Sequence, residues 1–172
     1  RSIKQYERER RRVMGYRSDV GIIVAFKTRL DMEKVIAIYK MDVDVQRLDL
    51  FAEWSIYEGK EVCFLQYRNE HVKWYDDYED VVGIRNLPKL AESFGETQNI
   101  PYAWKELNVG EDGAIHENSG SSSVGLSSST PELEEFCDDM LMVTHPEIHF
   151  GTEHSVNMDT VSEITNQEKG EE

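Results

Sequence analysis

Apolar residues occur along this chain in short runs, and their spacing changes from strand-like to helix-like and back. Residues 20–26 (VGIIVAF) form a continuous apolar run rich in β-branched side chains, which is typical of a strand buried on both faces. Apolar residues then recur at helical spacing, at Met32, Val35, Ile36 and Tyr39. Thr28 stands in front of them in an N-cap position, with Asp31 three residues later. The opening therefore predicts a strand, a short turn and an amphipathic helix.

The next segment, residues 41–57, fits two patterns at once. Alternation favours a strand at Leu48, Leu50, Ala52, Trp54 and Ile56. A helical stripe is also present, at Met41, Val45, Leu48 and Ala52. The pattern leaves helix and strand open for residues 43–54.

A second strand-helix-strand unit follows. Residues 62–67 have strand composition, and residues 71–75 continue the strand beyond the polar cluster at 68–70, where we expect a bulge. A helical face follows at Val81, Ile84, Leu87, Leu90, Ala91 and Phe94. Because proline disrupts a helix interior, Pro88 predicts a break in which Asn86 caps a second short segment, and Gly95 is expected to end the helix. Residues 102–109 then alternate as a strand, with a short returning edge at 114–117.

This order of elements predicts the fold class. A β-α-β-β-α-β series is typical of a two-layer α+β sandwich of ferredoxin-like type, here with an extra edge strand. Both helices would cover one face of the sheet. The other face would be open, as in many sheets that serve as docking surfaces.

The composition divides the chain into four parts: a polar, basic extension at 1–13, the α+β core at 14–118, a Ser-rich linker at 119–130 and an acidic tail at 131–172. Within the tail, Thr130 and Pro131 could start a short helix over residues 131–141. Its apolar face would consist of Leu133, Phe136, Cys137 and Met140. The remainder is polar and is expected to be disordered.

The charge of the chain restricts its partners. The formal net charge is −15, although residues 1–18 carry seven Lys or Arg against two Glu. An acidic body repels phosphate, so we expect no direct nucleic-acid binding by the core and instead a basic or nucleic-acid-binding protein partner. The basic extension is a candidate for contact with RNA or with an acidic surface. Two cysteines, Cys63 and Cys137, provide no disulfide framework, and no membrane-spanning run occurs, which favours a cytoplasmic protein.

The densest group of functional candidates follows the second strand. Residues 74–80 hold three aromatic residues and four carboxylates. Aromatic rings supply contact area, and carboxylates complement a basic surface. The expected partner-binding residues are Tyr75, Asp76, Asp77, Tyr78, Glu79 and Asp80, while Trp74 is expected to anchor the segment to the core. Carboxylates at a helix start are also common for structural reasons, so the motif alone leaves both interpretations open.

Catalytic and cofactor motifs are not evident in the sequence. The strongest metal candidates are histidines of the tail, at His145, His149 and His154. Their H-P-E-I-H order differs from the zinc-protease motif, and Pro146 weakens a helix that would align them, so no metal site is predicted. We therefore expect neither an enzyme nor a cofactor.

Two fragments, residues 14–20 (MGYRSDV) and residues 72–81 (VKWYDDYEDV), resemble a family of small acidic proteins of tailed bacteriophages. The resemblance covers residues 14–118 and carries no established chemistry. It implies an accessory protein in the cytoplasm of an infected bacterium, which occupies a basic or nucleic-acid-binding host protein. A virion component that uses its arm and tail for assembly is the main alternative, and a small metal-dependent enzyme is another.

Overall fold

A computed structural model describes residue 2 and residues 16–123, 125, 126 and 130–144, with side chains up to residue 141. The elements, in chain order, are β1 (Ser18–Phe26), α2 (Arg29–Lys40), α3 (Val43–Arg47), the 3-10 helix η1 (Leu50–Glu53), β2 (Trp54–Glu58), β3 (Cys63–Val72), α4 (Glu79–Gln98), β4 (Tyr102–Gly110), β5 (Ile115–Ser121) and α5 (Pro131–Thr144).

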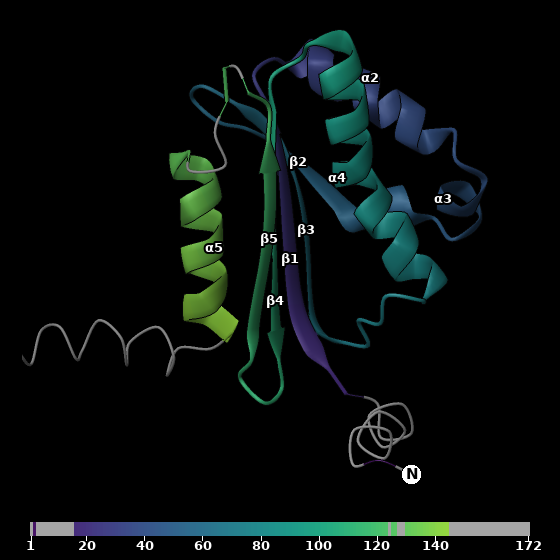
Figure 1. The fold of residues 1–172 in the computed structure, drawn as a ribbon, viewed down its shortest axis with the longest axis vertical. Coiled ribbons are helices and arrows are strands. Elements are labelled where there is room, and N and C mark those ends of the chain that lie inside the picture. Colours follow the sequence, from purple (N-terminus) through teal and green to yellow (C-terminus); the bar gives the residue numbers. More distant parts are fainter. Residues whose placement is uncertain (1, 3–15, 124, 127–129, 145–172) are drawn as a thin grey trace, which may run out of the picture.

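The sheet has five antiparallel strands in the order β2-β3-β1-β4-β5. The first four have the order of a ferredoxin-like sandwich, and β5 is the extra edge strand beside β4. The predicted α+β fold class is confirmed. Helices α2, α3 and α4 lie on one side of the sheet (Figure 1). Helix α5 lies on the other side, so the second face, which was expected to be open, is covered within the described part of the chain.

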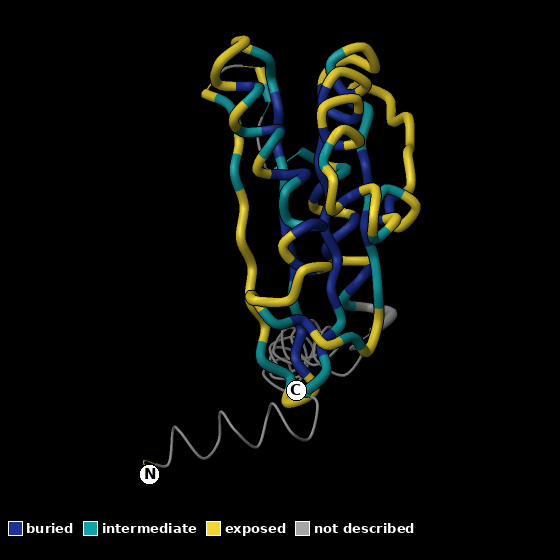
Figure 2. The backbone as a smooth tube through the Cα atoms, turned by 90° about the vertical axis from the view of Figure 1, so that its right-hand side faces the viewer, coloured by how far each residue is buried: buried dark blue, intermediate teal, exposed yellow. Residues whose placement is uncertain are grey.

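Each face of the sheet has its own apolar core, because side chains of a strand alternate between faces. Val20, Ile22 and Val24 of β1 join α2 and α4, whereas Ile23 and Ala25 join α5. Every residue of β1 from Val20 to Phe26 is buried, as expected for its continuous apolar run. Buried residues lie along the strands and inner helix sides, with exposed residues outside (Figure 2).

Two local predictions are confirmed at the ends of β1. The Thr28 side chain accepts a hydrogen bond from the Asp31 N–H at 3.2 Å and so caps α2. At the other end, β3 carries the expected bulge: Val20 pairs with Asn69 but Ser18 pairs with Val72. His71 absorbs the extra residue with a positive φ of 56°, and its N–H donates to Asp19 Oδ1 at 2.8 Å.

The expected break in the second helix is wrong. Helix α4 runs without interruption from Glu79 to Gln98, and Pro88 lies inside it in a buried position. Packing of the surrounding apolar face against the sheet offsets the hydrogen bond that proline cannot donate. Gly95 does not end the helix either, because Asn99 takes the left-handed conformation at its C-terminus. Gly95 is instead buried against the ring of Tyr102, where a Cβ atom would collide.

The ambiguous segment contains both kinds of structure. Asp42 caps the short helix α3 by accepting hydrogen bonds from the N–H groups of Asp44 and Val45. The single turn η1 follows, and the strand begins only at Trp54. The helical stripe and the alternation were therefore each correct over part of the segment.

The boundary between core and tail also differs from the expected one. Strand β5 extends to Ser121, three residues into the expected linker, and α5 packs on the sheet through the four predicted residues Leu133, Phe136, Cys137 and Met140. Thr130 does not act as a side-chain cap, since its hydroxyl is buried without a hydrogen-bond partner among the described residues. The predictions for residues 1–13, of which only Ser2 is described, and for residues 145–172, the tail histidines included, concern chain outside the described residues.

Candidate functional site

The segment that was expected to bind a partner links β3 to α4. The Tyr78 N–H donates to the Tyr75 carbonyl at 3.0 Å, which closes a turn between them, and the Val82 N–H then donates to the Tyr78 carbonyl at 2.9 Å. The Tyr75 and Tyr78 rings meet edge to face with their centroids 5.0 Å apart. The segment is thus an ordered corner at the N-terminal end of α4.

Trp74 anchors this corner, as predicted. Its side chain is 9% exposed, and its ring lies 5.5 Å from the ring of Tyr67 on β3. The guanidinium of Arg85 lies over the indole at 5.4 Å from the ring centroid. The indole N–H is buried and has no hydrogen-bond acceptor among the described residues.

Arg85 connects the corner to the sheet. Its Nε and Nη2 atoms donate to the two carboxylate oxygens of Glu106 on β4, at 2.9 and 3.2 Å, and its Nη1 atom pairs with Asp76. Burial lowers the pKa of Arg85, but the hydrogen bonds that it donates to Glu106 and Asp76 raise the pKa by more, so the guanidinium keeps its charge. Asp76 is therefore held partly by an internal ion pair, although 88% of its side chain is exposed.

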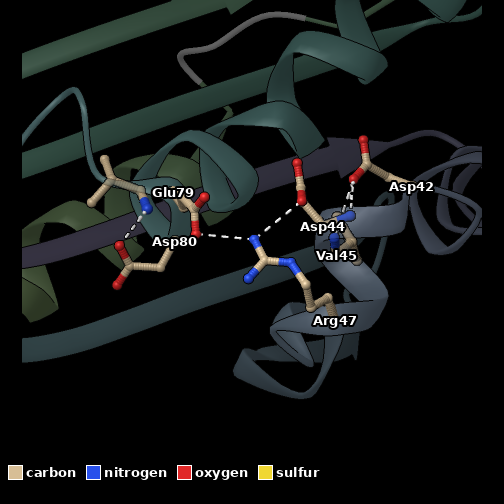
Figure 3. Close-up of polar contacts among 7 residues, drawn as sticks. Asp42, Asp44, Val45, Arg47, Glu79 and Asp80 are labelled. Carbon is tan, nitrogen blue, oxygen red and sulfur yellow. Dashed lines mark hydrogen bonds and ion pairs between the residues drawn. The ribbon is translucent and has the colours of Figure 1, made fainter.

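The last two of the predicted residues, Glu79 and Asp80, belong to the first turn of α4. Glu79 pairs with Arg47 of α3 at 3.0 Å, and Arg47 also pairs with Asp44 at 3.2 Å (Figure 3). Asp80 Oδ1 accepts a hydrogen bond from the Val81 N–H. Glu79 thus helps to join α3 to the start of α4, and Asp80 bonds within α4. Tyr75, Asp76 and Asp77 instead line a cavity.

This cavity, called here the sheet-end cavity, has a volume of about 690 Å3. It lies where β1 begins, β4 ends and β5 starts. Its lining residues are Tyr16, Ser18, Trp74, Tyr75, Asp76, Asp77, Asn108, Gly110, Asp112, Ala114 and His116. Three aromatic rings and three carboxylates thus meet at a single site.

Pairing of β1 with β4 brings the parts of the cavity together. Ser18 pairs with Gly110, which places the residue before β1 beside the turn after β4. The Tyr16 hydroxyl donates to Asp112 Oδ1, and the same oxygen accepts the Ala114 N–H at 3.1 Å. Gly110 has no room for a Cβ atom, because the Tyr16 hydroxyl lies directly against it. One wall of the cavity is thereby fixed.

The lining favours a cation. Asp76, Asp77 and Asp112 provide negative charge, and the faces of aromatic rings attract cations as well. A second cavity of about 480 Å3 shares Asp76 and continues along α4 and β5, past Pro88, Trp104 and Asn118. The lining of this second cavity is of mixed charge, with Arg85 and Lys89 beside Glu92 and Glu106.

The sequence indicated only half of this site. Tyr75, Asp76 and Asp77 were singled out, whereas Tyr16, Asp112 and His116 were missed because they lie far away in the chain. The predicted fold class contained the missing information: the strands at 20–26 and 102–109 are neighbours in a ferredoxin-like sheet, so residues just outside them must meet.

Neither a metal-binding cluster nor a membrane-spanning helix is found in the part of the chain that the structure describes. No group of three His, Cys, Asp or Glu residues there could hold a metal ion. Within the same residues, no helix has the length and apolar character to cross a bilayer. The comparisons with known proteins found no match, neither to a family model, nor to a curated protein, nor to a solved structure.

Proposed function

We propose that this protein is a non-enzymatic interaction module that binds a basic protein partner through the acidic corner at Tyr75–Asp80 and the adjoining sheet-end cavity. The supporting observation is the cavity itself, which brings Asp76, Asp77 and Asp112 together with Tyr16 and Tyr75. Carboxylates interspersed with aromatic rings complement Lys and Arg on a partner, and tyrosine gives contact area at a low cost in side-chain entropy.

The remaining carboxylates of the corner have a supporting role in this proposal. Glu79 is tied to Arg47, so it contributes to the shape of the corner and to the field that attracts a basic partner. The net charge of −15 acts in the same direction and disfavours nucleic acid as the direct ligand. The resemblance to acidic bacteriophage proteins would place this partner among basic or nucleic-acid-binding proteins of an infected bacterium.

The experiment that tests the proposal compares two pairs of neighbouring aspartates. Asp76→Asn with Asp77→Asn removes two charges from the corner. Asp138→Asn with Asp139→Asn removes two charges from α5 on the opposite side of the sheet, and it matches the first pair because Asp139, like Asp76, is bound to an arginine.

Immobilised full-length chain and both variants are exposed to bacterial lysate, and proteins that elute with salt are identified. The expected result is a set of basic proteins that the corner variant loses and the α5 variant keeps. For each identified partner, association should be slower with the corner variant and should depend less on salt. Equal retention by both variants would refute the proposal.

A further inference from the structure

We propose that two copies of this chain associate through the free edge of β2, with the two β2 strands antiparallel and their sheets joined into one. The proposal goes beyond the proposed function, because no residue of β2 belongs to the acidic corner or lines the sheet-end cavity. It assigns an interaction surface to the edge of the sheet and a second copy of this chain as the partner.

The pairing of β2 with β3 shows which way its main-chain groups point. Strand β2 is at one edge of the sheet, and β3 is its neighbour. The Gly59 N–H donates to the Val62 carbonyl at 2.8 Å, so these two residues form a hydrogen-bonded pair at the end of the β2-β3 hairpin. Hydrogen-bonded and non-hydrogen-bonded pairs alternate along an antiparallel ladder. Counting back from Gly59, Ser55 and Tyr57 direct their N–H and C=O groups toward β3.

The alternate residues of β2, Trp54, Ile56 and Glu58, direct their main-chain groups away from the sheet. The Trp54 N–H is already used, because it donates to the Phe51 carbonyl. The N–H and C=O groups of Ile56 and Glu58 and the carbonyl of Trp54 remain, on a strand whose last four residues are all exposed. A row of outward donors and acceptors is a template for another strand.

Antiparallel pairing about Ile56 makes this edge complementary to itself. Ile56 of each copy then lies opposite Ile56 of the other, and Glu58 lies opposite Trp54. Each Ile56 N–H can donate to the Ile56 carbonyl of the other copy, and each Glu58 N–H can donate to the Trp54 carbonyl. Such a contact uses the same surface on both copies and closes as a two-fold dimer.

The exposed side chains of β2 fit the same register. Ile56 is 44% exposed and meets its own copy across the two-fold axis, while Tyr57, 47% exposed, meets the small Ser55. The Tyr57 ring is held in place by stacking on Phe64, with the ring centroids 5.5 Å apart. Edge strands of monomeric proteins are commonly protected by a charge, a proline or a bulge. The three central residues of β2, Ser55 to Tyr57, carry neither charge nor proline, and their pairing with β3 is regular.

Charges at the two ends of β2 favour a second copy over an unrelated strand. Glu53 directly precedes β2 and Lys60 follows it in the turn to β3; both are exposed, and neither forms an ion pair among the described residues. Antiparallel pairing about Ile56 brings Lys60 of each copy to the end of β2 at which Glu53 of the other copy lies. Exposed ion pairs add little affinity, but they favour one orientation over others.

The net charge of the chain opposes this association. At −15 per copy, two acidic bodies repel one another. Salt screens this repulsion, whereas it leaves main-chain hydrogen bonds and apolar contacts largely unchanged. The dimer should therefore be weaker at low salt and should become stronger as salt is added.

The test is sedimentation of the full-length chain at concentrations up to about 1 mM, in low and high salt. A reversible monomer–dimer equilibrium is expected, with more dimer in high salt. Ile56→Lys places two like charges opposite one another at the centre of the contact and should raise the Kd of the dimer about tenfold or more. Ile115→Lys is the matched control, because Ile115 on the opposite edge strand β5 is 42% exposed and the charge changes equally. The control should not weaken the dimer.

Single cysteines test the register, in a Cys63→Ser background that leaves only the buried Cys137. Ile56→Cys should be linked to its own copy by a mild oxidant, because Cα atoms of a hydrogen-bonded pair lie about 5.5 Å apart, within disulfide reach. Tyr57→Cys should be linked more slowly, since it faces Ser55 instead of itself.

A chain that stays monomeric at every concentration and salt level would overturn the proposal, as would a dimer that Ile56→Lys does not weaken more than Ile115→Lys. Equal rates of linkage for the two cysteine variants would overturn antiparallel pairing about Ile56. Loss of the dimer in high salt would show that charge pairs hold the copies together, which contradicts a contact made by the strand edges.

Discussion

Arg85 of α4 and Glu106 of β4 form a two-point ion pair, with nitrogen–oxygen distances of 2.9 and 3.2 Å. Glu106 is only 5% exposed, so the pair is largely withdrawn from water. The same guanidinium contacts Asp76 and the face of Trp74. Through this one residue, the position of α4 on the sheet is coupled to the position of the corner that lines the cavity.

Removal of Arg85 should therefore destabilise the protein. Arg85→Ala leaves the buried Glu106 carboxylate without its partner, and a loss of about 2–4 kcal/mol in the free energy of unfolding is expected. Arg85→Met combined with Glu106→Leu should recover most of this loss, because no charge is then left buried. Urea unfolding of the two single variants and the double variant measures the coupling. If the stability losses of the two single variants simply add up in the double variant, the Arg85–Glu106 ion pair contributes little to stability.

Trp74 should be more important for stability than the exposed residues that follow it. Trp74→Ala is expected to cost about 3–5 kcal/mol, because the large ring is buried between Tyr67 and Arg85. Asp77→Asn, at an exposed position, should change stability by about 0.5 kcal/mol or less. Thermal and urea unfolding compare the two. A small effect of Trp74→Ala would mean that the corner is held by its polar contacts instead.

The sequence predicted those elements whose pattern and local chemistry agree. The apolar run of β1, the Thr28 cap of α2 and the apolar face of α5 each follow from residues close together in the chain. The errors in α4 have a different origin. Pro88 and Gly95 disfavour a helix locally, but both are buried by residues from elsewhere in the chain, Gly95 by the ring of Tyr102. Tertiary packing, which local patterns do not contain, decided the outcome there.

The same difference between local patterns and tertiary contacts explains which residues of the candidate site the sequence revealed. Its dense part, Tyr75 to Asp77, is contiguous and was visible as a motif. Tyr16 and Asp112 meet only because β1 pairs with β4, and a single tyrosine or aspartate carries no motif. The ion pairs also change the interpretation of the motif: the sequence shows four crowded carboxylates, yet Asp76 and Glu79 are each bound to an arginine of the same protein.

Helix α5 can be tested through Gly21 of β1, which lies directly beneath it. A side chain at Gly21 would collide with Met140 and Phe136 of α5. Gly21→Val should therefore weaken the docking of α5 by roughly 1–3 kcal/mol, which raises the undocked fraction about five- to 150-fold. The buried Cys137 reports this directly, by its rate of reaction with a thiol reagent in a Cys63→Ser background. An unchanged rate would show that α5 adjusts without undocking.

Alkaline pH should weaken the packing of α5 on the sheet. Burial raises the pKa of the Cys137 thiol from an ordinary value near 9 to about 11, against a smaller opposing effect of Lys105. A raised pKa means that the folded form binds the proton more tightly, so this stabilisation is complete below pH 9 and is lost as the pH rises through 11. Lys105, bound to Glu117 and Glu134 under α5, also has a raised pKa and acts in the same direction. Unfolding measured from pH 8 to 11 should show a steeper loss of stability in the original protein than in Cys137→Ala.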